Sequence, residues 1–67
     1  MTKLYQPHEL RVIEEKADLD DRLKKLSMFT LGNRFGDLPE EDRELLLIQR
    51  AQMASLSYTL GARIRRF

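Results

Sequence analysis

The chain has 67 residues, a formal net charge of +1 and 34% charged residues. A chain of this length forms one domain at most and buries too little apolar surface to be very stable without a staple or a partner. It contains no cysteine, which excludes disulfides and thiolate metal sites. No apolar run approaches the roughly 20 residues that span a bilayer, and no signal-peptide pattern follows Met1. We therefore expect a cytoplasmic protein with no membrane role.

Charge is unevenly distributed along the chain. All eleven carboxylates lie in residues 1–44, whereas residues 45–67 carry four arginines and no carboxylate. Three of these arginines, Arg63, Arg65 and Arg66, fall within the last five positions. This asymmetry predicts that one end of the molecule attracts anions although the total charge is close to neutral.

The first predicted helix begins at Pro7 and ends at about residue 28. Proline suits the first helical position because its missing N–H has no intrahelical partner there. Acidic residues come early in this segment and Lys24 and Lys25 come late, which complements the helix dipole. Residues 29–38 contain two glycines and Asn33 and form the predicted loop, with Phe35 folding back onto the hairpin.

The second predicted helix covers about residues 39–66. Asp37 and Glu40 have the spacing of a capping box. The first turn of this helix is acidic and its last turn is basic, as the dipole favours. Two helices joined by a short loop pack antiparallel, so the expected fold is all-α, a single antiparallel two-helix hairpin covering residues 1–67.

Each predicted helix carries two apolar stripes when residues are placed about 100° apart. In the first helix one stripe consists of Val12, Leu19, Leu23 and Leu26, and the other of Leu10, Ile13 and Ala17. In the second helix one stripe consists of Leu45, Leu46, Met53, Leu56, Leu60, Ile64 and Phe67, and the other of Leu47, Ile48, Ala51, Ala54, Tyr58 and Ala62.

A lone hairpin buries only one stripe of each helix. The surplus stripes predict a dimer or tetramer of hairpins that assembles into a helical bundle. The alternative is that the loop folds back over part of them. The expected interface residues are Leu10, Ile13, Leu47, Ala51, Ala54, Tyr58 and Ala62.

Catalytic and metal-binding patterns are weak in this sequence. His8 is the only histidine, and no cysteine accompanies it, so we expect neither a metal nor another cofactor. Ser27, Ser55 and Ser57 have no convincing general base. The carboxylates are typical of a solvated helix face, not of a tuned acid and base. An enzyme is therefore not expected.

The open end of the hairpin is the candidate site. Antiparallel packing places the start of the first helix, with His8, beside the arginines that end the second, and guanidinium groups suit phosphate. The candidate ligand-binding residues are Arg63, Arg66, Arg11, Tyr5 and Lys3, with Tyr58, Thr30 and Asn33 as stacking or polar contacts. The alternative is that the arginines only offset the helix dipole. The acidic first helix disfavours a nucleic-acid duplex as ligand.

Two long segments of the sequence resemble a family of very short phage and prophage proteins, the crAss-phage-related small proteins. The segments are RVIEEKADLDDRLKKLSMF and LPEEDRELLLIQRAQMASLSYTLGARIRRF, with Phe35 in the loop between them. Gln49 and Met53 match a Q-x-x-x-M element of the family pattern, and Arg63 and Ile64 match its terminal element. The resemblance covers residues 11–64 and implies a viral accessory protein in the cytoplasm of a bacterial host.

In size, helical build and expected oligomerisation the chain is also similar to phage sponges. These proteins sequester nucleotide immune signals, such as the cyclic dinucleotides of CBASS or the cyclic ADP-ribose signals of Thoeris. The resemblance implies a homo-oligomeric protein of immune evasion that binds such a signal without catalysis. The alternative is a protein–protein inhibitor or adaptor that docks a helical face in a groove of a host protein.

Overall fold

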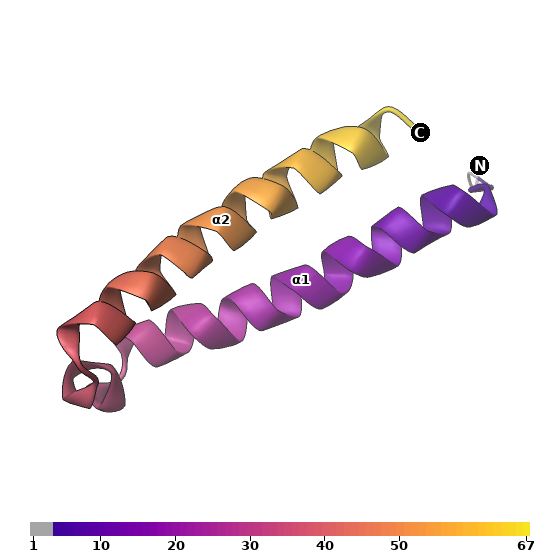
Figure 1. Cartoon of the computed structure of the whole chain (residues 1–67). Helices are drawn as coiled ribbons and strands as arrows, with labels where there is room; N and C mark the ends of the chain where they lie inside the picture. The colour runs from indigo at the N-terminus through magenta and orange to yellow at the C-terminus, as the bar shows by residue number, and fades with distance from the viewer. Residues whose placement is uncertain (1–3) are drawn as a thin grey trace.

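The computed structural model describes residues 4–67 and shows an antiparallel helical hairpin. Helix α1 (Pro7–Leu31) leads through a short 3-10 helix, η1 (Asn33–Asp37), into helix α2 (Glu40–Arg65). Figure 1 shows the start of α1 and the end of α2 at the same end of the hairpin, the open end, opposite the turn. The hairpin measures 49 × 16 × 16 Å. The expected all-α hairpin is therefore confirmed for the described residues, and Lys3 lies outside them.

Helix α1 begins at the expected proline. Gln6 precedes it, and the Gln6 backbone N–H donates a hydrogen bond of 2.8 Å to Oε1 of Glu9, which satisfies a donor at the helix start. The capping box expected at Asp37 and Glu40 is absent. Helix α2 instead follows Pro39, which has no side chain able to cap it.

Helix α1 continues to Leu31, three residues beyond its expected end. Local hydrogen bonds close this last turn: Thr30 Oγ1 donates to the carbonyl of Ser27 at 2.8 Å, and the Gly32 N–H donates to the carbonyl of Phe29 at 3.0 Å. The expected fold-back of Phe35 is observed. Its ring meets Phe29 edge to face, with centroids 6.2 Å apart, and this contact anchors η1 to the end of α1.

The apolar core lies between the two helices. Val12 and Leu19 of α1 and Leu60 of α2 are buried, and Met53 and Ile64 pack against them with Phe67. The shielded positions of α2 recur at alternating spacings of three and four residues, as in other pairs of packed helices. They are Arg43, Leu46, Arg50, Met53, Ser57, Leu60 and Ile64, and Phe67 continues the series just after the helix. Gly61 and Ala62 are also half-buried, beside this series.

Two residues assigned to the core stripe of α2 are misplaced by the sequence analysis. Leu45 is 63% exposed and Leu56 is 45% exposed. The reason is that Arg50 and Ser57 occupy positions that face α1. A stripe that includes only apolar residues is centred too far toward Leu56, because the face of α2 that contacts α1 also includes these two polar residues.

Polar contacts join the helices along the same seam. Near the turn, Arg50 Nη1 donates to Thr30 Oγ1 at 2.9 Å. Further along, Ser57 Oγ donates to Oδ1 of Asp20, and the Lys16 ammonium lies 2.6 Å from the other carboxylate oxygen. Gly61 makes room for Lys16, since a β-carbon there would lie 3.2 Å from Lys16 Cε. These contacts fix the register of α1 against α2.

The outward face of α2 remains apolar and uncovered. Leu45, Leu47, Ile48, Ala51, Ala54 and Tyr58 are all exposed, Tyr58 to 74%, and only Ala62 of the expected α2 interface is half-buried. On α1 the expected interface residue Leu10 is exposed and Ile13 is half-buried. Within residues 4–67 no helix has the length and apolar character that crossing a membrane requires.

Candidate ligand-binding site

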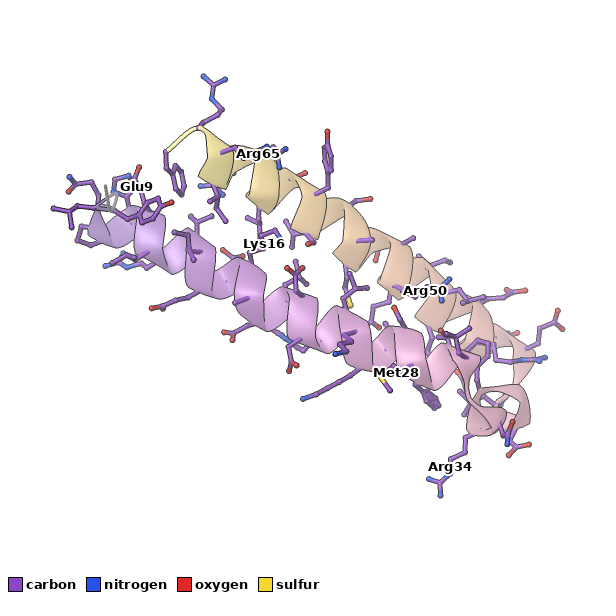
Figure 2. All side chains as sticks on the ribbon, turned by 180° about the vertical axis from the view of Figure 1, so that it is seen from behind. Glu9, Lys16, Met28, Arg34, Arg50 and Arg65 are labelled. Carbon is purple, nitrogen blue, oxygen red and sulfur yellow. The ribbon has the colours of Figure 1, made fainter. Side chains whose placement is uncertain are left out.

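The last turn of α2 presents a cluster of guanidinium groups at the open end. Arg63, Arg65 and Arg66 are exposed, and none makes a side-chain hydrogen bond or ion pair with any residue between 4 and 67. Figure 2 shows Arg65 at this end of the molecule and Arg34 at the other. Unpaired, exposed guanidinium groups can each donate two parallel hydrogen bonds to a phosphate.

The start of α1 lies beside this cluster, as expected from antiparallel packing (Figure 1). Tyr5 is half-buried just before α1, and Arg11 and His8 are exposed in its first turns. The first turn of α1 does not offer a free anion site, however. The Glu9 carboxylate already accepts the Gln6 N–H, so a negative charge of the chain itself occupies this helix terminus.

The remaining candidate residues do not join this cluster. Thr30 lies in the last turn of α1 and Asn33 begins η1, so both lie at the closed end of a hairpin that is 49 Å long. Thr30 is also engaged with Ser27 and Arg50. Tyr58 lies on the outward face of α2. A small ligand on one hairpin therefore cannot contact Arg63 and Asn33 together.

A polar cluster that the sequence analysis missed lies midway along the seam. Ser57, for which the sequence offered no convincing general base, donates its hydroxyl to Asp20. The hydrogen bond from Lys16 and that from Ser57 hold the pKa of Asp20 below its ordinary value. Asp20 is therefore a weaker base than an ordinary aspartate, the opposite of what activation of a serine requires. The only signal for this cluster in the sequence is that Lys16 and Asp20 have opposite charges and lie four residues apart on one helix.

Two further observations complete the description of the surface. The described residues contain no pocket, and they contain no group of three or more His, Cys, Asp or Glu side chains arranged to hold a metal ion. Arg43 Nε is buried without a hydrogen-bond partner in residues 4–67. The arrangement that can bind a charged ligand is thus the exposed arginine cluster at the open end.

These features define a small helical-hairpin protein with segregated charge and a basic end suited to an anion. The chain belongs to the Sequestin family, whose model matches residues 6–66. The name of the family refers to sequestering, and the match fits the expected likeness to phage proteins that sequester nucleotides. The relation to crAss-phage small proteins stays a prediction. No curated protein and no solved structure matches the chain.

Proposed function

We propose that this protein binds and sequesters a small phosphate-bearing nucleotide signal of the cyclic dinucleotide or cyclic ADP-ribose type. It releases the signal chemically unchanged and acts as a phage counter-defence protein in the cytoplasm of the infected bacterium. The observation that carries the proposal is the cluster of Arg63, Arg65 and Arg66, whose guanidinium groups have no partner within residues 4–67. Membership of the Sequestin family supports the same role.

The geometry of the hairpin favours a site where copies meet. A body 16 Å across is two helices thick, so its surface is mainly convex. Small-molecule sites are concave because a ligand gains affinity by burying most of its surface. Junctions between hairpins supply such concave surfaces, with Arg63 and Arg66 holding phosphate and Tyr5 or Tyr58 stacking on a base.

A thermal-shift screen against cyclic dinucleotides, cyclic trinucleotides and ADP-ribose derivatives tests the proposal. A ligand that binds only the folded protein raises its melting temperature. Replacing Arg63 by Ala should weaken binding by about 1.5–3 kcal/mol, the range for a hydrogen bond to a charged group. The matched control is Arg22→Ala, which removes an exposed arginine near the middle of α1, away from both ends of the hairpin, and should leave affinity unchanged.

The outward face of α2 favours a second candidate function. An exposed apolar helix face can dock in a groove of a host protein, as expected of an inhibitor or adaptor. The two functions make different demands on this face. If a second copy of the chain covers it, the face is not available to a host protein.

A further inference from the structure

The outward face of α2 is uncharged over a long distance. Residues 45–62 contain a single charged side chain, Arg50, and it is bonded to Thr30 on the inner seam. At about 1.5 Å per residue, these 18 residues present an uncharged face roughly 27 Å long. The outward face of α1 differs, since it carries exposed charges such as Glu14, Asp18 and Lys24. Of the two helices, α2 therefore has the outward face that a second protein chain can cover without burying charges.

Opposite charges stand at the two ends of this face. Glu40, Glu41, Asp42 and Glu44 are exposed at the start of α2, and Arg63, Arg65 and Arg66 are exposed at its end. No ion pair engages any of them within residues 4–67. Glu41 and Arg65 are separated by 24 residues, or about 36 Å of helix. The two groups are therefore too far apart to neutralise each other within one copy.

We infer that α2 pairs antiparallel with α2 of a second copy of this chain through this uncharged face. Antiparallel pairing places the acidic first turn of each copy against the basic last turn of the other, so that both ends become complementary. Parallel pairing places like charges together at both ends. The charge pattern therefore selects the antiparallel arrangement and a two-fold axis across the pair.

The charges also set the register of the pair. When Glu41 lies opposite Arg65 or Arg66, residue numbers that face each other sum to 106 or 107, and the axis passes near residue 53. The same register brings Leu45 opposite Gly61 or Ala62, and Ile48 opposite Tyr58 or Thr59. Small side chains, Ala51 and Ser55, then lie beside the axis, where they allow the helices to approach closely.

This pairing unites the two halves of the candidate site. The basic open end of one copy comes alongside the closed end of the other, which carries Thr30 and Asn33. A role of Thr30 and Asn33 in ligand binding rests on the proposed function, whereas the pairing of α2 with α2 of a second copy does not. The experiment that follows therefore uses no ligand.

Cross-linking of single-cysteine variants tests the arrangement, because the chain has no cysteine of its own. Leu45→Cys and Ala62→Cys leave every charge in place, and Ser55→Cys lies near the proposed axis. Each variant is purified, and the first two are also refolded together before treatment with a short bismaleimide. We expect Ser55→Cys to cross-link with itself, and Leu45→Cys to cross-link with Ala62→Cys but not with itself.

Two outcomes overturn the inference. Efficient cross-linking of Leu45→Cys with itself and of Ala62→Cys with itself, with nothing gained by mixing, shows parallel pairing. No cross-linking of any variant, with a monomeric mass in light scattering at micromolar concentration, shows that this face is not self-associating and leaves it to a host protein.

Charge transposition provides a second test that does not depend on cysteine chemistry. Glu41→Lys should weaken association several-fold, because it places lysine beside arginine at both ends of the pair. Adding Arg65→Glu to the same chain should restore it, because the two charges are exchanged. Circular dichroism confirms that each variant stays helical. An equal or greater loss in the double variant contradicts antiparallel pairing.

Discussion

Asp20 links the two helices through one carboxylate, and its pKa is lowered by the hydrogen bonds from Lys16 and Ser57. A carboxyl group whose pKa is lower in the folded state stabilises the protein fully above its unfolded pKa. This contribution is lost as the pH falls through the folded pKa. We therefore predict that the hairpin loses stability as the pH falls below 3.8, the ordinary pKa of an aspartate side chain. Asp20→Asn should remove the part of this loss that comes from Asp20.

Urea melts of the wild type and Asp20→Asn between pH 7 and pH 2 measure this effect. The variant should be less stable at pH 7, and the difference between the two proteins should shrink as the pH falls below 3.8. Asp21→Asn is the matched control, because Asp21 pairs with Lys25 on the solvated face at 3.0 Å. A constant difference between wild type and Asp20→Asn across the whole range contradicts the role assigned to Asp20.

Arg43 carries a buried Nε without a hydrogen-bond partner in residues 4–67. A buried donor that is left unpaired costs about 1–3 kcal/mol. We predict that Arg43→Met raises the free energy of unfolding by about 1 kcal/mol, since methionine replaces the apolar stem without the donor. Denaturant melts measure the change, with the exposed Arg34→Met as control. A loss of stability instead shows that the guanidinium forms a bond that stabilises the fold.

Polar residues account for most of what the sequence failed to predict at this scale. Arg43, Arg50 and Ser57 occupy helix positions that face the partner helix, where a pattern search expects apolar side chains. The partners of Arg50 and Ser57, which are Thr30 and Asp20, lie far away in sequence, so only the packed hairpin reveals them. The exposed arginines at the open end were predictable because they follow directly from the charge pattern.

At the scale of the helices, the burial of two leucines of α2 separates the core from the outward surface. Leu60 is 2% exposed, whereas Leu56, one turn earlier, is 45% exposed. We predict that Leu60→Ala lowers the free energy of unfolding by about 2–5 kcal/mol, the range for a buried leucine. Leu56→Ala should cost roughly 1 kcal/mol or less, because the transfer and cavity terms are both reduced.

Denaturant melts at low protein concentration, where association contributes least, compare the two variants. The two substitutions remove the same atoms from the same helix, so each is the control for the other. Equal losses of stability in the two variants would contradict the face that α2 turns toward α1. A larger loss for Leu56→Ala would place Leu56 on the face that contacts α1, as the apolar pattern predicts.

The helices themselves were predictable because strong local signals mark them. Pro7 starts α1, and Gly32 and Gly36 interrupt the helical structure between α1 and α2. The capping boxes were not predicted correctly, because Gln6 is a rare capping residue and Pro39 displaced the start of α2 beyond Asp37. The fold-back of Phe35 was expected, but the short helix η1 was missed, because glycines and an asparagine indicate a loop without specifying a 3-10 helix.

For the whole molecule, the segregation of charge connects the fold with the proposed function. An uncharged face on α2 lies between an acidic and a basic end. We propose that copies associate through this face and that Arg63, which the pairing with Glu41 does not use, holds a phosphate-bearing ligand at the junction between them. The sequence predicted the hairpin and its basic end. Residue-by-residue ligand contacts depend on how copies meet, which one chain does not determine.

Sequestration without chemical change is the central claim, and equilibrium dialysis tests it most directly. The protein is dialysed against the nucleotide signal that most raises its melting temperature, or against the whole screening set if none does, and is then denatured to release what it holds. The account predicts saturable uptake in a fixed ratio to the protein, with recovery of the unaltered nucleotide by mass spectrometry. No uptake of any nucleotide, or recovery of a converted product, would contradict it.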